Sequence, residues 1–140
     1  MVDLANAILF GTALYHLVMG AFVFASPTVL ARITKALYGT DAFARRLEDS
    51  PAFLYVTKMT GCFALALATL CAQALRFEPA PKRAVLISLA VLFLARTASR
   101  WFFRDLFCRA FGSTSARNFK HVVFNLALAT LSAAVGFEAL

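Results

Sequence analysis

The chain has 140 residues, of which 61% are hydrophobic and 15% are charged, and its mean hydropathy is +0.77. A soluble domain carries about 25% charged residues, and a globule this small cannot bury so many apolar side chains, because its surface is large for its volume. The composition therefore excludes an ordinary soluble protein and predicts an integral membrane protein. The net charge of +7 does not indicate nucleic-acid binding, because the basic residues lie at the ends of apolar segments, as membrane topology signals do.

Four apolar segments have about the 20 residues that a membrane-spanning helix needs. In chain order, these predicted spans cover residues 5–26, 52–75, 84–103 and 121–138. The first and second spans are bordered by the same helix-start signal, since Ser26-Pro27 and Ser50-Pro51 each place a capping Ser before a Pro at the first helical position. The first segment is expected to remain in the protein as a transmembrane helix, because it lacks the basic start of a signal peptide.

Residues 27–38, which follow the first span, form a predicted short amphipathic helix. Leu30, Ile33 and Leu37 fall at helical spacing, whereas Arg32 lies elsewhere on the helical wheel. The pattern fits a helix that lies at the membrane surface, and it fits equally well a helical connector that packs on the spans. Both interpretations stay open at the level of sequence.

A proline-rich break over residues 78–81 separates the second and third spans, and residues 112–115 end the third helix and cap the fourth. Asp105 and Arg109 are spaced to pair on a helix, so the third helix is expected to continue beyond the membrane as far as Gly112. The predicted fold is a single all-α domain over residues 1–140, an integral membrane four-helix up-and-down bundle with an extended third helix.

The basic residues between the spans predict an orientation. Residues 31–51 and 104–121 contain eight Lys or Arg residues, whereas residues 76–83 contain three. Because short loops rich in Lys and Arg stay on the cytoplasmic or matrix side, both termini are expected on the outer side. The expected location is an energy-transducing membrane, either the mitochondrial inner membrane or the bacterial inner membrane.

Two basic residues lie inside the predicted spans and are candidates for a binding site. Lys58 and Arg96 each lie about seven residues from the same face, which places them roughly 10 Å deep. Asn125 falls in the same slab. Together they are a possible polar site for a lipid headgroup or a quinone, but we favour long side chains that extend to the interface, since no span carries an acid at this depth.

Arg100, Trp101 and Arg104 lie where the third span leaves the membrane. Aromatic and basic residues collect at this level, so one interpretation is anchoring and topology. The other is a binding site for an anionic lipid such as cardiolipin, or for an acidic partner.

No nucleophile elbow, phosphate loop, zinc motif or pair of acids occurs in the sequence, and the acidic residues lie at segment ends or in loops. We therefore expect no catalytic activity, no metal site and no cofactor. His16, near the middle of the first span, is expected to be a buried histidine bonded to a neighbouring helix rather than a haem or quinone ligand.

Two stretches, 20-GAFVFASPTVLARITKALYG-39 and 58-KMTGCFALALATLCAQALRFEPAPKRAVLISLAVLFLAR-96, together combine features in a characteristic order. A span with Gly leads to a Pro and a short Leu-Tyr-Gly helix, and an Ala-rich span leads to a proline-broken basic turn and a span with Arg. Over residues 15–100 the chain thus resembles the DoxX-like group of small four-helix membrane proteins, although Lys58 stands where such sequences often have Arg. The resemblance implies no catalytic residue, and some members of the group are described as subunits of quinol-oxidising complexes.

These patterns predict a non-catalytic accessory subunit of a larger membrane complex, plausibly a respiratory or other energy-transducing one, with other membrane subunits and anionic lipid as partners. The alternative is a stand-alone four-helix membrane protein that binds lipid, sterol or quinone around Lys58, Arg96 and Asn125. A small transporter is disfavoured, since the spans lack acids and broken helices.

Overall fold

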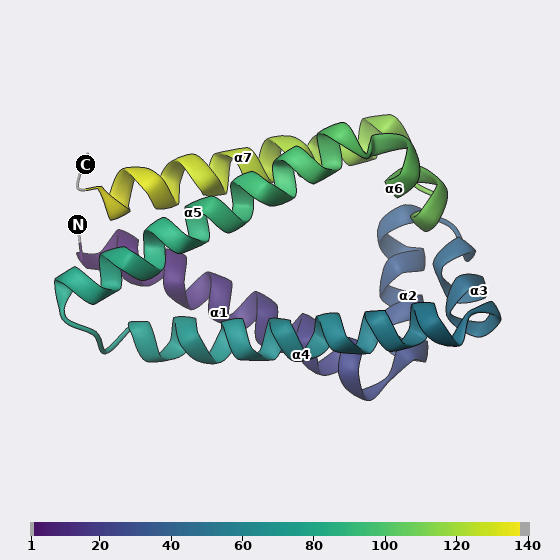
Figure 1. Ribbon diagram of the computed structural model, residues 1–140, viewed down its shortest axis with the longest axis horizontal. Helices are drawn as coiled ribbons and strands as arrows, with labels where there is room; N and C mark the ends of the chain where they lie inside the picture. Colours follow the sequence, from purple (N-terminus) through teal and green to yellow (C-terminus); the bar gives the residue numbers. More distant parts are fainter. Residues whose placement is uncertain (1, 138–140) are drawn as a thin grey trace.

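A computed structural model describes the backbone over residues 2–137, and the side chains there except those of residues 2, 3, 27 and 38. This part of the chain forms seven helices and no strand (Figure 1). In chain order they are α1 (Val2–Ala25), α2 (Pro27–Tyr38), α3 (Ala42–Asp49), α4 (Pro51–Ala74), α5 (Pro79–Phe102), α6 (Arg104–Phe111) and α7 (Ser115–Gly136).

The four long helices, α1, α4, α5 and α7, are each long and apolar enough to cross a membrane. Each coincides with one predicted span, so the prediction of an α-helical membrane protein with four spans is confirmed at this level. The helix α5 begins at Pro79 and α7 at Ser115, both earlier than the apolar pattern indicated. The end of the fourth predicted span, residue 138, lies outside the described residues.

The predicted helix boundaries are confirmed by their caps. The Ser26 hydroxyl accepts a hydrogen bond from the Val29 N–H at 3.4 Å, and the Ser50 hydroxyl accepts one from the Phe53 N–H at 3.2 Å. Gly112 ends α6 in the left-handed region, with φ of 61°. A Ser before a Pro therefore starts a helix in this structure, and the Gly at residue 112 ends one, as expected from their capping preferences.

Two features of the structure differ from the predicted elements. Residues 42–49 form the helix α3, which the apolar pattern did not indicate. The prediction of one extended third helix is wrong, because α5 ends at Phe102 and α6 sets off in another direction (Figure 1). The turn lets Phe111 of α6 stack on Phe43 of α3, with ring centroids 5.1 Å apart and nearly parallel planes. A straight helix would carry Phe111 away from that contact.

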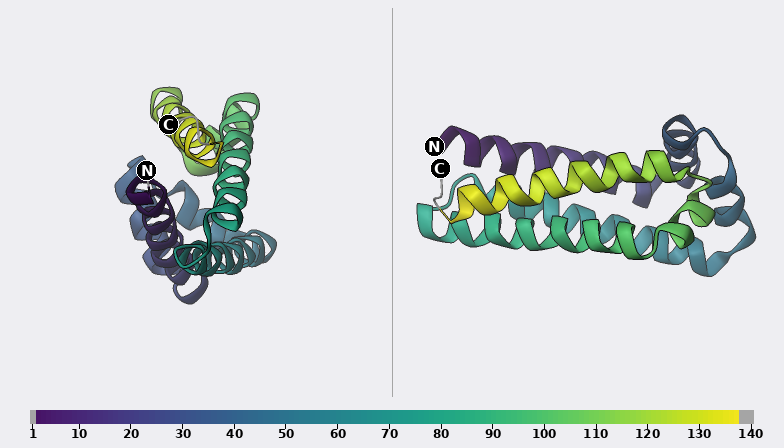
Figure 2. Two further views of the ribbon diagram at one scale, coloured as in Figure 1. Left: turned by 90° about the vertical axis from the view of Figure 1, so that its left-hand side faces the viewer. Right: turned by 90° about the horizontal axis from the view of Figure 1, so that it is seen from above.

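The four long helices pack as two antiparallel pairs, α1 with α4 and α5 with α7 (Figure 1). The two pairs diverge, and an end-on view shows α5 rising away from α4 beyond their connecting turn (Figure 2). The start of α1 and the end of α7 lie at the same end of the molecule. We call this the terminal end, and the opposite end, formed by α2, α3 and α6, the basic end.

Glycines set the close approach within each pair. A Cβ atom added to Gly61 of α4 would lie 3.0 Å from the Phe24 backbone nitrogen and 3.1 Å from the Gly20 carbonyl oxygen of α1. A Cβ atom added to Gly136 of α7 would lie 2.8 Å from the Ile87 side chain of α5. Small residues therefore bring the backbones together, which is how helices gain packing energy where the solvent is as apolar as they are.

Contacts at both ends join the two pairs. At the terminal end, apolar side chains of all four long helices form one cluster, which includes Leu9, Cys71, Leu86 and Ala129. At the basic end, a smaller cluster forms around three buried residues of α2 and α3, Leu30, Phe43 and Leu47. Because α2 is packed on this cluster, the connector interpretation of residues 27–38 has direct support.

Replacing Gly61 by Leu should destabilise the α1–α4 pair, because the new side chain clashes with backbone atoms of α1, which cannot move aside as a flexible side chain could. We expect a loss of about 1–3 kcal/mol, the usual range for overpacking, measured by unfolding in mixed detergent micelles. Gly11→Leu is the matched control on α1, since a Cβ atom there has no neighbouring atom within 4 Å. Equal stability of the two variants would contradict the close approach at Gly61.

Candidate functional site

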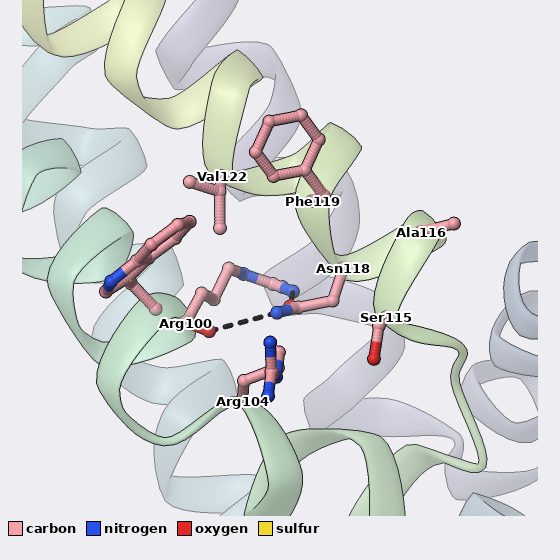
Figure 3. A pocket seen from close by; sticks show the side chains of 8 residues that line it. Arg100, Arg104, Ser115, Ala116, Asn118, Phe119 and Val122 are labelled. Carbon is pink, nitrogen blue, oxygen red and sulfur yellow. Dashed lines mark hydrogen bonds between the residues drawn. The ribbon is translucent and has the colours of Figure 1, made fainter.

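A pocket of about 310 Å³ opens at the basic end, between the last turn of α5 and the first turns of α7 (Figure 3). We call it the interface pocket. It is lined by Arg100, Trp101, Arg104, Ser115, Ala116, Asn118, Phe119 and Val122. The structure thus brings together three of the six residues that sequence reasoning proposed for binding, Arg100, Trp101 and Arg104.

Arg100 is held in place from two sides. Its Nη1 atom donates a hydrogen bond to Asn118 Oδ1 at 3.2 Å, and Asn118 Nδ2 donates to the Arg100 carbonyl oxygen at 2.9 Å. The guanidinium carbon also lies 4.2 Å from the centre of the Phe107 ring. These contacts orient the guanidinium. Neither an amide nor an aromatic ring neutralises its positive charge, and no described acidic side chain forms an ion pair with it.

Arg104 supplies the second positive charge of the pocket. Its Nε atom lies 3.3 Å from Asp105 Oδ1, but 58% of the Arg104 side chain and 80% of the Asp105 side chain are exposed. An exposed pair of this kind contributes little, because water screens it and long side chains lose entropy in holding it. The pocket therefore keeps a positive potential at the level where the spans end.

The first turn of α7 also faces the pocket. Ser115 and Ala116 are its first residues, and the Thr114 hydroxyl caps the helix by accepting the Arg117 N–H at 3.3 Å. The first N–H groups of a helix have no partner within the helix and carry a partial positive charge. The helix start thus reinforces the positive potential that Arg100 and Arg104 create.

A second group of polar residues lies deeper, towards the centre of the spans. The guanidinium of Arg96 is within electrostatic reach of His16 on α1 and of His121 on α7. Asn125 Nδ2 donates a hydrogen bond to the His121 carbonyl oxygen at 2.6 Å. We call these four residues the deep polar group. His16 belongs to the α1–α4 pair and the other three to the α5–α7 pair, and none of them is acidic.

Within the deep polar group, the Arg96 guanidinium forms no hydrogen bond or ion pair with another described residue. Lys58 is half-buried on α4, and no hydrogen bond joins it to Arg96 or Asn125 among the described residues. The predicted slab of three residues is therefore split, with Lys58 on the α1–α4 pair and the other two on the α5–α7 pair.

His16 is buried, as predicted, but its hydrogen bond stays within its own helix. Its Nδ1 atom lies 2.8 Å from the Thr12 carbonyl oxygen, and its ring meets the Tyr15 ring edge to face at 5.0 Å between centroids. The second ring nitrogen is thus left for contacts outside this helix turn. No group of three or more His, Cys, Asp and Glu side chains that could hold a metal ion occurs among the described residues.

Sequence reasoning missed Asn118, although a signal for it exists. Small and polar residues recur on α7 at alternating steps of four and three, and all of them are buried: Asn118, Val122, Asn125, Ala129, Ser132 and Gly136. This heptad spacing marks one face of a helix, and its continuation before residue 121 would have placed Asn118 on the face towards α5.

Comparisons with models of protein families, with curated proteins and with solved structures found no match. The resemblance to the DoxX-like group therefore stays a prediction, and the function has to be inferred from the residues themselves.

Replacing Asn118 by Leu should destabilise the protein by about 1–3 kcal/mol, because the variant loses a hydrogen bond from a charged group and leaves the Arg100 carbonyl unpaired. Unfolding in mixed micelles measures the loss. Thr130→Val is the control on the same helix, since the exposed Thr130 hydroxyl donates only to the Leu126 carbonyl at 3.0 Å. Similar stability of both variants would show that the Arg100–Asn118 contact is unimportant.

Proposed function

We propose that this protein is a non-catalytic accessory subunit of a larger membrane complex, in a respiratory or other energy-transducing membrane, and that anionic lipid stabilises it there. One observation carries the proposal, a row of small side chains on the exposed face of α5. The row consists of Ala84, Ser88, Ala95 and Ser99, all of which are exposed. On the helical wheel it lies roughly opposite the buried residues Leu89 and Phe93.

Small residues on an exposed face favour a protein neighbour over lipid. Other faces of the chain present large apolar side chains outward, such as Phe63, which is 70% exposed, and Phe124, which is 61% exposed; on α5 itself, Val91 borders the row and is 63% exposed. Lipid tails gain nothing from a flat helix face, whereas another helix gains close packing, as α1 does where Gly20 meets Gly61. The row on α5 is therefore suited to a membrane-spanning helix of another subunit.

The low burial of α4 supports the same proposal. Only 11% of the residues in its most apolar stretch are buried within the chain, although α4 packs along α1. An accessory subunit presents such faces to its neighbours and to lipid. The resemblance to the DoxX-like group, some of whose members are subunits of quinol-oxidising complexes, points in the same direction.

In that assembly we expect the four spans to run up and down as one unit, with the basic end in the matrix or cytoplasm and both termini on the outer side. The basic end carries Arg and Lys residues in α2, α3, α6 and the start of α7. The excess of Lys and Arg in short connections favours this orientation.

Purification of the tagged protein from its native membrane in mild detergent tests the subunit proposal. We expect one or more membrane proteins to co-purify at a fixed ratio, quantified by mass spectrometry, because helix contacts survive mild detergent. Ser88→Leu combined with Ala95→Leu should lower their recovery at least about tenfold, since bulky side chains block close helix approach.

Ala127→Leu is the matched control, because Ala127 is exposed on α7 away from the row. This variant should keep its partners. A wild-type monomer without co-purifying subunits would overturn the proposal, and so would partners that the double variant retains in full.

The deep polar group favours a second candidate function, the binding of a lipid, sterol or quinone by the chain alone. A cation in the membrane without an acidic partner is costly unless it extends to the interface or meets a hydrogen-bond acceptor. Arg96 lies near His16 and His121, so the carbonyl of a quinone or the carboxylate of a fatty acid would find several donors there.

If this second function is right, purified Arg96→Gln protein should retain less than about a tenth of the quinone or fatty acid that the wild type carries, as measured by extraction and mass spectrometry. Arg76→Gln removes the same charge at the exposed terminal end of α4 and should leave the content unchanged. Equal content in both variants would rule out a ligand held by Arg96.

A further inference from the structure

We infer that the interface pocket binds the phosphate group of one anionic glycerophospholipid, whose acyl chains then lie along Phe119 towards the hydrocarbon core. The inference deepens the lipid part of the proposed function and does not depend on its subunit part. Sequence reasoning named Arg100, Trp101 and Arg104 either as membrane anchors or as binding residues for an anionic lipid or an acidic partner, and the structure adds α7 as the second wall of the pocket.

The charge of the pocket calls for an anion. Arg100 and Arg104 both line it, and their side chains point into the same region as Asn118 (Figure 3). Two guanidinium groups that line one pocket repel each other, and an anion that binds beside them removes that repulsion. The acidic side chain nearest in sequence, Asp105, is mostly exposed, and within the described part of the chain its ion pair is with Arg104. A phosphate accepts several charge-assisted hydrogen bonds at once, which is the geometry that guanidinium groups favour.

Arg100 is already oriented for such a ligand. The hydrogen bond from its Nη1 to Asn118 Oδ1 and its contact with the Phe107 ring hold the guanidinium without using all of its donors. A side chain fixed in advance loses less entropy when a ligand binds. Ser115 and Ala116 at the start of α7 line the opposite wall, where the first N–H groups of a helix have no partner within the helix.

The other side of the pocket is apolar and faces the membrane. Trp101 is 59% exposed and Phe119 is 54% exposed, whereas Val122, one turn further into the span, is buried and lines the inner part of the pocket. A volume of about 310 Å³ corresponds to roughly ten water molecules, which suits a phosphate with part of its glycerol. The acyl chains of the lipid then run outside the pocket, over Phe119 and towards the hydrocarbon core.

This arrangement distinguishes a lipid from free phosphate, although both offer the same anionic oxygens. A soluble phosphate uses only the polar wall, whereas a phospholipid also covers apolar side chains that would otherwise lie at the headgroup level. Trp101 is the single tryptophan of the chain, so its fluorescence reports directly on what approaches the pocket.

The experiment uses the full chain in neutral detergent, titrated with phosphatidylglycerol that carries brominated acyl chains, which quench a nearby indole. Brominated phosphatidylcholine, whose phosphate is balanced by choline, serves as the comparison lipid. We expect half-maximal quenching of Trp101 at a concentration at least about tenfold lower for phosphatidylglycerol, since two basic residues favour the anionic headgroup. Excess inorganic phosphate should not reverse the quenching.

Variants separate a built site from general attraction by a basic surface. Arg100→Gln with Arg104→Gln should abolish the preference to within about twofold. Arg45→Gln with Arg109→Gln removes the same charge from exposed positions of α3 and α6 outside the pocket, and should keep it. The single variant Arg104→Gln leaves the Arg100–Asn118 contact intact, so it guards against a folding defect and should lose part of the preference.

An equal loss in both double variants would reduce the effect to surface charge and overturn the inference. Reversal by inorganic phosphate would assign the pocket to a soluble anion instead of a lipid. A wild type without preference for phosphatidylglycerol would refute the site and the lipid part of the proposed function together. The subunit part would remain untouched, because it is judged by co-purification.

Discussion

The fold depends on glycines that let the backbones of neighbouring helices approach closely. This packing is needed because the lipid around membrane helices provides no hydrophobic force that would drive them together. In hydrocarbon, an apolar side chain gains nothing by leaving lipid for another helix, so association has to come from tight packing. Gly20 and Gly61 allow it between α1 and α4, and Gly136 allows it between α7 and α5. These contacts explain why the structure consists of two well-packed pairs whose long helices otherwise diverge.

Because the pairs diverge, contacts at their two ends join them, and at the terminal end a polar contact adds to the apolar cluster. Lys82 of α5 donates hydrogen bonds to Asn6 Oδ1 of α1 at 3.1 Å and to the Leu75 carbonyl at 3.2 Å, so it ties three helices at the terminal end. At the basic end the tie is α6, which turns back to stack Phe111 on Phe43. The same turn opens the space between α5 and α7 in which the interface pocket lies.

Features set by neighbouring residues could be predicted from the sequence, and features set by distant contacts could not. Ser26 and Ser50 could be recognised as N-caps of helices, because each cap is a hydrogen bond to the backbone N–H three residues later. The helix α3 is too short and polar for a span, and its two buried residues, Phe43 and Leu47, depend on packing against other helices. The break at Phe103 allows Phe111 to stack on Phe43, which lies 68 residues earlier in the chain (111 − 43), and no local pattern contains such a contact.

The candidate site follows the same division, and the arginines of the third span illustrate it. Arg96, Arg100 and Arg104 are each four residues apart, so spacing alone predicts one stripe of equivalent charges. One helical step of four residues is about 6 Å of depth, which in a membrane separates the headgroup layer from hydrocarbon. Arg100 and Arg104 line the interface pocket beside α7, whereas Arg96 lies one step deeper and forms no ion pair with a described residue. Arginines on one stretch of sequence therefore have different surroundings, and these surroundings are set by how the two helix pairs pack.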